Sequence, residues 1–199
     1  GAIDKEIIII DDFSTDGTRN LLKQFESENK YNIFYHEKNL GKGAAVKTGL
    51  SHVTGDYVII QDADLEYDPD DYSKLIEPIV LGQADIVFGS RVLSGINVPF
   101  SSVYFYGGLM VAKIFNLLFG TKFSDITTCY KIFPANLAPI LARLPNNDFV
   151  FDAVYLTYQL SKSGKIVEIP IHYNARSKAK GKKLNWRHGV KCFIAMIKL

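Results

Sequence analysis

The sequence predicts an α/β fold in which a mostly parallel sheet is flanked by helices. Short apolar runs rich in β-branched residues recur along the chain, and a polar or glycine-containing turn with a helical pattern follows each of the first three. Strands that alternate with helices in this way form parallel sheets with right-handed crossovers. With 199 residues and 47% hydrophobic content, the chain can bury one full core, and no long linker divides it.

The individual elements follow from hydrophobic periodicity and from the turn residues between them. Strands are expected at residues 6–10, 31–35, 57–60, 85–89, 130–133 and 166–173. Helices are expected to end near residues 25 and 53, to cover residues 69–81, 103–119, 135–144 and 151–163, and to begin again at residue 186. The stretch 103–119 is almost uniformly apolar, but its length is marginal for a membrane span, which favours a buried or interfacial helix.

The strongest chemical signal lies directly after the expected strand at 57–60. This apolar run breaks abruptly into a series of acids, of which Asp62 and Asp64 come first. Two acids at positions i and i+2, at the carboxyl end of a strand, can bind one hard divalent cation through oxygen. We therefore expect this pair to hold Mg²⁺ or Mn²⁺, which keeps further positions for phosphate oxygens. The acids within residues 68–71 are interpreted instead as the cap and first turn of the next helix.

Two further strand ends carry candidate binding groups. Asp11 and Asp12 follow the first strand, and the turn Gly41, Lys42, Gly43 follows the second. In one sheet these ends and the acidic stretch would line a single crevice that offers carboxylates to a base or ribose and a lysine with backbone N–H groups to phosphate. This combination describes a nucleoside-diphosphate site, although the glycine turn by itself is equally typical of a plain helix start.

Charge is distributed unevenly along the chain. The net charge is only +2, yet no acid follows Glu168 and eight basic residues do. The basic loop at 176–183 and the cationic amphipathic helix after it favour a polyanionic partner. Cys129 and Cys192 have neither metal-ligand spacing nor the number needed for a disulfide framework, so a reducing compartment is expected.

Several motifs, in this order and spacing, resemble glycosyltransferase family 2 with the GT-A fold. They lie at residues 10–18, 39–44, 61–69 and 89–91. The match is best for the dolichol- or polyprenyl-phosphate mannosyl/glucosyltransferase branch, to which the stretches 124–133, 149–152 and 167–171 are also similar. The resemblance therefore spans nearly the whole chain.

The resemblance implies a role for each matching residue. It assigns Asp11, Asp12, Gly41, Lys42, Gly43 and Asp62 to the nucleotide sugar, Asp62, Asp64 and Glu66 to the metal, and Asp64, Arg91 and Asp125 to catalysis. Within this scheme Arg91 faces the acceptor phosphate and Asp125 lies near the sugar. Two alternatives stay open: Arg91 could pair with an acid instead, and Asp152 could be a helix cap.

The chain also departs from the family pattern. Family members begin with a strand and a Pro-x-Tyr-Asn-Glu-like turn ahead of the strand at 6–10, and the GT-A fold expected here lacks that first strand. Val154 stands where relatives often have a glutamate after the aspartate of their Phe-x-Phe-Asp motif. Many relatives continue into membrane-spanning segments beyond the position where this sequence ends.

The expected activity is the inverting transfer of a hexose from a nucleotide-diphosphate sugar, of the GDP-mannose or UDP-glucose type, to a polyprenyl or dolichyl phosphate. An anionic acceptor needs positioning and charge neutralisation rather than a strong base. Residues 1–175 would form the catalytic domain, and residues 176–199 a basic loop and helix at the cytoplasmic face of a membrane.

Other interpretations remain open at this point. The acceptor could be a polysaccharide or another hydroxyl compound, or the chain could be a degenerate nucleotide-sugar-binding module. The basic end could be a solvated loop with a core-packed helix. Nucleic-acid binding is not expected, because acids dominate the rest of the chain and no stacking platform accompanies the lysines. Oligomer formation through the apolar stretch 103–119 is possible.

Overall fold

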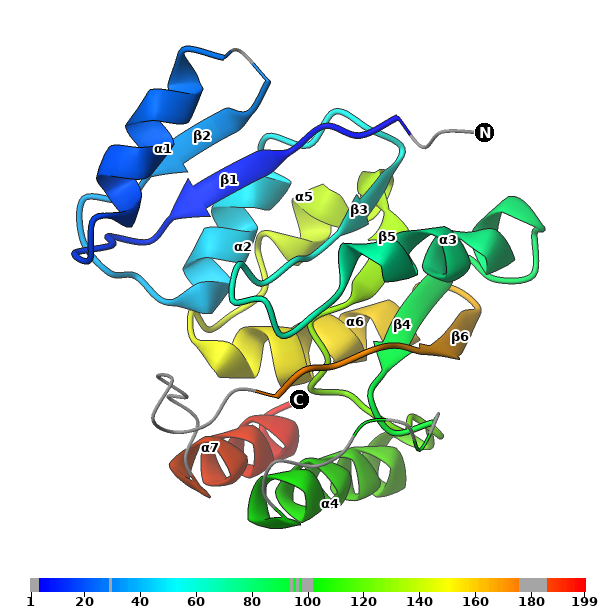
Figure 1. The fold of residues 1–199 in the computed structure, drawn as a ribbon. Coiled ribbons are helices and arrows are strands. Elements are labelled where there is room, and N and C mark those ends of the chain that lie inside the picture. The colour runs from blue at the N-terminus through cyan, green and yellow to red at the C-terminus, as the bar shows by residue number, and fades with distance from the viewer. Residues whose placement is uncertain (1–3, 29, 94, 96, 98–101, 176–185) are drawn as a thin grey trace.

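The structure is a computed structural model, and it describes residues 4–28, 30–93, 95, 97, 102–175 and 186–199. Its strands are β1 (Ile8–Asp11), β2 (Asn32–Tyr35), β3 (Tyr57–Ile59), β4 (Ile86–Ser90), β5 (Lys131–Pro134) and β6 (Ile166–Pro170). Its α-helices are α1 (Thr18–Glu26), α2 (Lys42–Leu50), α3 (Tyr72–Val80), α4 (Ser102–Phe119), α5 (Ala138–Leu141), α6 (Thr157–Ser161) and α7 (Trp186–Ile197). Three short helical segments complete the order: η1 (Pro69–Asp71), η2 (Ala135–Leu137) and η3 (Phe151–Leu156) (Figure 1).

The strands form two sheets rather than one. β1 pairs with β2 in parallel, whereas the second sheet has the order β3-β5-β4-β6. In this second sheet β4 and β6 are parallel, but β5 is antiparallel to both of its neighbours. The reason is that the connection through α4 returns the chain in the opposite direction before β5. The α/β architecture is as expected, while the second sheet is mixed. Among the described residues, no strand precedes β1.

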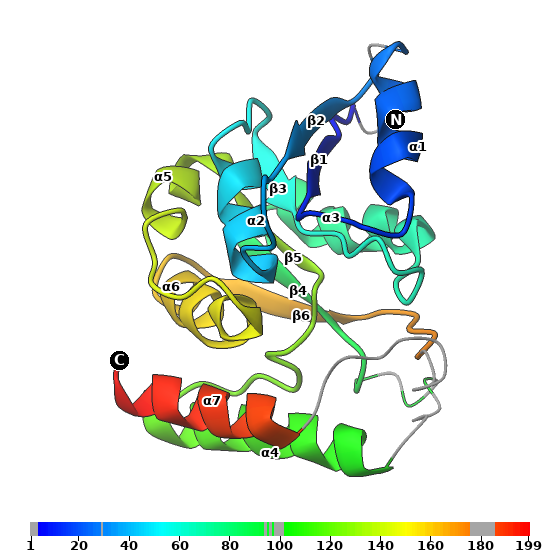
Figure 2. The same cartoon turned by 90° about the vertical axis from the view of Figure 1, so that its left-hand side faces the viewer.

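The main core lies around β4. All five residues of this strand are buried, as expected for a central strand with a continuous apolar run. α3 packs on β4 and β6, while α2, α5 and η3 pack together. In Figure 2, α2, α5 and α6 lie on one side of the strands and α3 lies on the other. Helices therefore pack on both sides of the strands whose ends carry the site residues.

A second core joins α4, η3 and α7. Its buried side chains include Phe115 of α4, Val154 of η3, and Cys192 and Met196 of α7. Both views show α4 and α7 side by side, far from each other in sequence (Figures 1 and 2). One face of the terminal helix is thus packed into a core. Within the described ranges, no helix is long and apolar enough to span a membrane.

Helix type and length differ from the expectation in two places. The helix expected at 135–144 is η2 followed by α5, which ends at Leu141. The helix expected at 151–163 begins as the π-helix η3 and becomes α-helical only from Thr157 to Ser161. A π-helical turn inserts an extra residue, and α-helical periodicity in the sequence does not reveal it.

Candidate active site

The acidic loop between β3 and η1 presents its carboxylates to different neighbours. Asp62 Oδ2 lies 2.9 Å from the Nζ of Lys42, and Asp64 Oδ1 accepts a 3.1 Å hydrogen bond from the N–H of Glu66. The hydroxyl of Tyr173 donates to Glu66 Oε2 over 2.7 Å. No group of three or more His, Cys, Asp or Glu side chains within the described residues could hold a metal. The oxygen ligands suit Mg²⁺ or Mn²⁺, but the three carboxylates are not gathered around one point.

The start of this loop is fixed by Gln61. The hydroxyls of Tyr72 and Tyr130 donate to Gln61 Oε1 over 2.8 and 2.6 Å, and Gln61 Nε2 donates to the carbonyl of Asp62 over 2.7 Å. Sequence reasoning did not find this arrangement, because the tyrosines come from α3 and from the residue before β5. The side-chain amide oxygen of Gln61 is therefore fixed by two tyrosines directly before Asp62 and Asp64.

Lys42, the first residue of α2, is the cation nearest to the acidic pair. Its Nζ lies 2.9 Å from Asp62 Oδ2 and also 2.9 Å from Asp152 Oδ2. Burial lowers the pKa of Lys42, but the charges of Asp152 and Asp62 raise it by more than burial lowers it. The pKa of Lys42 therefore lies well above its ordinary value. Asp152 is in turn paired with Lys131, whose Nζ lies 2.8 Å from Asp152 Oδ1. Although burial raises the pKa of Asp152, the two lysines hold it below its ordinary value.

The glycine turn packs against the protein's own chain. Gly41 has a φ of +94°, and a Cβ placed there would lie 2.5 Å from the carbonyl oxygen of Asn147. A Cβ at Gly43 would lie 2.6 Å from the Cβ of Phe151. These glycines therefore allow α2 to approach the segment that leads into η3. Their part in donor binding stays a prediction.

Asp11 and Asp12 are both engaged by groups of the protein. Asp11 Oδ2 pairs with Arg19 Nε at 2.6 Å, and its side chain is buried. The carboxylate of Asp12 accepts 2.8 Å hydrogen bonds from the N–H groups of residues 40 and 41, and lies 2.7 Å from His36 Nδ1. The end of β1 and the glycine turn thus come together as expected, through Asp12. Contact of either aspartate with a nucleoside stays a prediction.

Arg91 and Asp125 form a bidentate pair at the carboxyl end of β4. Arg91 Nε and Nη2 donate to the two oxygens of Asp125 over 2.6 and 2.8 Å, and Nη2 also donates to Thr127 Oγ1. The backbone N–H of Asp125 donates to Glu168 Oε1 over 3.1 Å. Arg91 thus pairs with an acid, as one alternative held. The Arg91 side chain remains 21% exposed.

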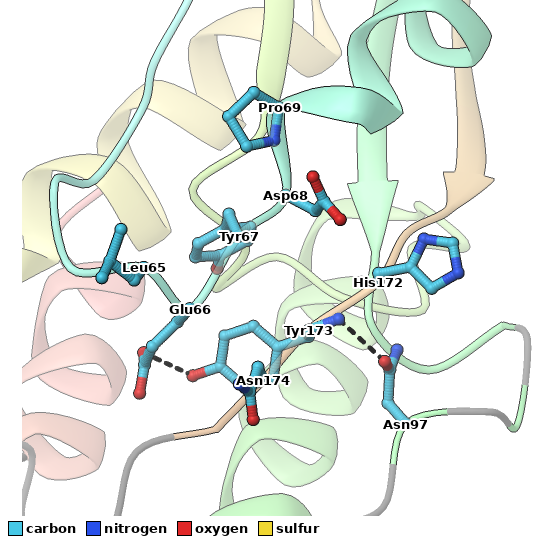
Figure 3. Close-up of a pocket in the computed structure, with 9 residues that line it drawn as sticks. All are labelled: Leu65, Glu66, Tyr67, Asp68, Pro69, Asn97, His172, Tyr173 and Asn174. Carbon is cyan, nitrogen blue, oxygen red and sulfur yellow. Dashed lines mark hydrogen bonds between the residues drawn. The ribbon is translucent and has the colours of Figure 1, made fainter.

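A pocket of about 420 Å³ lies beside the acidic loop, at Glu66. Figure 3 shows the residues that line it: Leu65, Glu66, Tyr67, Asp68, Pro69, Asn97, His172, Tyr173 and Asn174. Its wall is held by Asn97, whose amide donates to the carbonyls of Arg91 and Ile171 and whose Oδ1 accepts from the N–H of Tyr173. Among the described residues that line the pocket, none is a lysine or an arginine.

Tyr173 joins the acidic loop to Arg91. Its hydroxyl donates to Glu66, as the dashed line in Figure 3 shows, and its ring centroid lies 5.0 Å from the guanidinium carbon of Arg91. The structure therefore brings Lys42 together with Asp62, brings Arg91 together with Asp125, and links the acidic loop to the arginine. The sequence carried no signal for Tyr173, because β6 and the acidic loop are about a hundred residues apart.

Comparison with known proteins places these observations in a family. The model described as "Glycosyl transferase family 2" matches residues 2–133. The dolichol-phosphate mannosyltransferase of Pyrococcus furiosus is 30% identical over 187 residues, which cover 90% of this chain and 52% of that protein. The chain thus spans about half the length of this relative.

Solved structures show the same architecture. Glucosyl-3-phosphoglycerate synthase from Mycobacterium tuberculosis, in complex with Mn²⁺, UDP-glucose and phosphoglyceric acid, superimposes with a TM-score of 0.66 at 16% identity, covering 96% of this chain and 68% of its own. Mannosyl-3-phosphoglycerate synthase from Rubrobacter xylanophilus superimposes with a TM-score of 0.67 at 16% identity. The match covers 98% of this chain and 61% of that protein's chain. Both have the GT-A fold, so the expected fold class is confirmed.

Proposed function

Because this chain belongs to glycosyl transferase family 2, whose model matches residues 2–133, we propose that it transfers a hexose with inversion from a nucleotide-diphosphate sugar to a polyprenyl or dolichyl phosphate. The donor would be of the GDP-mannose or UDP-glucose type. The similarity to a dolichol-phosphate mannosyltransferase supports this acceptor class. The observation that carries the proposal is the meeting of the acidic loop and Arg91 at Tyr173, because a diphosphate bound at the loop would then lie beside a cation for a second phosphate.

The donor side would be built by Asp62, Asp64 and Lys42. The oxygens of the two aspartates fit Mg²⁺ or Mn²⁺, and the M. tuberculosis neighbour binds Mn²⁺ together with UDP-glucose. Such an ion, when bound, offsets the negative charge of the departing diphosphate. Lys42 would add a fixed ammonium on the same side. In a metal role, Glu66 would offer a carboxylate oxygen to the ion while the Tyr173 hydroxyl holds Oε2.

The acceptor side would be built by Arg91 and Asp125. Asp125 orients the guanidinium plane through two hydrogen bonds, and the exposed part of the guanidinium would donate to an acceptor phosphate. An oxygen of that phosphate then attacks the anomeric carbon in line, the bond to the nucleoside diphosphate breaks, and the configuration inverts. No proton has to move, because the acceptor is already an anion. Rate enhancement would come from positioning and charge stabilisation.

The lipid would be met at a surface formed by α4 and α7, here called the two-helix face. Its exposed apolar side chains are Tyr106, Met110, Leu117 and Leu118 of α4 and Val190, Phe193, Ile194 and Ile197 of α7. Neither helix contains an aspartate or a glutamate, and Lys113 and Lys191 are exposed on them. Apolar side chains with cations and no acids suit an anionic lipid surface. This supports peripheral attachment at the cytoplasmic face of a membrane.

A transfer assay with labelled donors tests the proposal. GDP-mannose and UDP-glucose are each offered with Mn²⁺ or with EDTA to polyprenyl phosphate in vesicles, to 3-phosphoglycerate and to an oligosaccharide. Label is expected in the lipid from one donor, and only with the metal. Label on phosphoglycerate or on the oligosaccharide would replace the lipid acceptor with a soluble one. Nucleotide binding without any transfer would favour a nucleotide-sugar-binding module.

A further inference from the structure

Lys131 and Asp152 form an ion pair that is shut away from solvent. Their side chains are 0% and 1% exposed, and Nζ lies 2.8 Å from Oδ1. Removing two charges from water costs free energy that their attraction only partly returns, and apolar residues of similar volume often serve stability equally well. Stability alone therefore does not account for this pair. The second carboxylate oxygen of Asp152 faces Lys42, which suggests that the buried pair serves Lys42.

A series of alternating charges leads from this pair to the acidic loop. The order is Lys131, Asp152, Lys42, Asp62, with 2.9 Å from Lys42 Nζ to an oxygen of each aspartate. Exposure rises along the series, since the side chains of Lys42 and Asp62 are 26% and 32% exposed. The series thus starts in the core and ends at the carboxylate that is proposed to bind the donor.

The local fold is arranged so that Asp152 can reach Lys42. Asp152 lies on the fully buried π-helix η3, and such wide turns occur frequently at functional sites. Gly43 is adjacent to Lys42 and lacks the Cβ that would collide with Phe151, the neighbour of Asp152. The missing side chain at Gly43 therefore lets the first turn of α2 lie against η3.

We propose that Asp152 is a positioning residue that holds the ammonium of Lys42 at the diphosphate of the donor. The inference rests on the proposed function, because it requires a diphosphate at Asp62. When the donor engages Asp62, Asp152 is the carboxylate that remains for Lys42. A lysine side chain held by a buried partner loses less conformational freedom on binding than one held only at the surface. Lys131 keeps Asp152 in place and in its charged form.

A double-mutant cycle on nucleotide affinity tests this assignment. Binding of UDP and of GDP with Mn²⁺ is measured by calorimetry for the wild type, Asp152→Asn, Lys42→Gln and the double variant. Each single change is expected to weaken binding about tenfold, and the double variant is expected to bind no more weakly than Lys42→Gln, because Asp152 acts through Lys42. Additive losses, or full affinity in Asp152→Asn, would overturn the proposal.

The matched control is Asp148→Asn, the same change at a half-buried position four residues earlier, where Asp148 pairs with Lys191. It is expected to bind nucleotide like the wild type, and an equal loss there would also count against the proposal. If Asp152→Asn does not fold because Lys131 is left unpaired, Asp152→Asn is combined with Lys131→Met, which leaves no unpaired buried ammonium. This pair of changes is expected to show the same loss of affinity, and unchanged affinity would overturn the assignment.

The same cycle on melting temperature, without ligand, separates the two proposals. Asp152→Asn is expected to lower Tm less in the Lys42→Gln background than in the wild type, because the contact to Lys42 is already gone. If the wild type binds neither nucleotide, the proposed function fails, and the Tm cycle still decides whether Asp152 holds Lys42. If the wild type binds nucleotide and both cycles are additive, the positioning role fails and the proposed function stands.

Discussion

Asp125 is a buried carboxylate that its neighbours keep charged. Burial raises the pKa of Asp125, but Arg91 lowers it through charge and two hydrogen bonds, and the result is a pKa below the ordinary value. A carboxylate with a lowered pKa in the folded state stabilises the fold above the pKa of the unfolded chain, and this contribution disappears as the pH falls through the lowered value. Asp125 therefore ties the stability of the site to pH.

Replacing Asp125 by asparagine is expected to lower the free energy of unfolding by about 3 kcal/mol at neutral pH, because Arg91 is left without its buried partner. The difference from the wild type should shrink as the pH falls below about 4, the ordinary pKa of aspartate, because the unfolded wild-type chain takes up a proton there, whereas folded Asp125, with its lowered pKa, takes it up only at lower pH. Urea unfolding of both proteins at several pH values measures this difference in the free energy of unfolding. A difference that does not change with pH would show that the charge of Asp125 is not responsible.

Asp64 is the residue on which metal-dependent turnover is expected to depend. Changing Asp64 to alanine should reduce transfer by about a hundredfold or more, because an oxygen ligand of the proposed metal is lost. Asp70→Ala is the matched control, since Asp70 is an exposed acid in the first turn after the same loop. Initial rates of sugar transfer at several Mn²⁺ concentrations give the comparison. Full activity of the alanine variant with unchanged metal dependence would remove Asp64 from the metal site.

At the scale of elements, α2 is placed by its contact with the segment before η3. Gly43→Ala would put a Cβ 2.6 Å from Phe151 and 2.8 Å from the backbone of Asn147, and such overpacking is expected to cost about 1–3 kcal/mol. Gly107→Ala in α4 is the control, because its Cβ would meet nothing within 4 Å and alanine stabilises helix interiors by up to about 1 kcal/mol. Chemical unfolding of both variants and of the wild type measures their free energies of unfolding. Equal stability of the two would contradict the close approach.

The two-helix face gives a prediction about membranes. Leu117→Glu and Ile197→Glu place a charge at side chains that are 84% and 65% exposed, and each is expected to weaken binding to anionic vesicles about tenfold by removing an apolar side chain from the interface. Val80→Glu on α3, also on a highly exposed residue, is the control and should bind like the wild type. Vesicle flotation measures the bound fraction. Equal binding to neutral and anionic vesicles would contradict a preference for anionic lipid, and no binding to either would argue against a lipid surface as the partner.

At the scale of the whole molecule, donor binding should appear as stabilisation. With Mn²⁺ present, a nucleotide at about a hundred times its Kd adds about 2.7 kcal/mol to the free energy of unfolding. For a domain of this size this corresponds to a rise in Tm of about 5–10 °C. UDP and GDP are compared by calorimetric melting, and only the nucleotide of the natural donor is expected to give the full rise. No rise with either would contradict a nucleotide-sugar site.

Much of this architecture could be predicted from local patterns. The apolar runs located five of the six strands to within about two residues, because a run of β-branched side chains between turn residues is typical of a strand. The last strand was expected to continue to residue 173, but β6 ends at Pro170. The motifs at residues 10–18, 39–44 and 61–69 indicated the family, and the family model then matched residues 2–133. The helix beginning at residue 186 was also located correctly, since α7 spans Trp186–Ile197.

Other features could not be predicted because they depend on contacts between distant segments. Nothing local to β5 reveals that it runs antiparallel between β3 and β4. Asp152 of η3 was interpreted as a possible helix cap, but its charge is shared between Lys42 and Lys131. Lys42 lies about 110 residues before Asp152 in the sequence, and Lys131 lies 21 residues before it. Such partners are close only after the chain has folded.

The sequence by itself determined the class of fold, the family and the candidate residues, because these follow from the order and spacing of side chains along the chain. Only the tertiary structure decided what each candidate touches. Asp62 faces Lys42, Glu66 faces Tyr173, and Arg91 is held by Asp125. The physical reason is that a charge enters a core only with a partner within hydrogen-bonding distance, and the packing of strands and helices selects that partner.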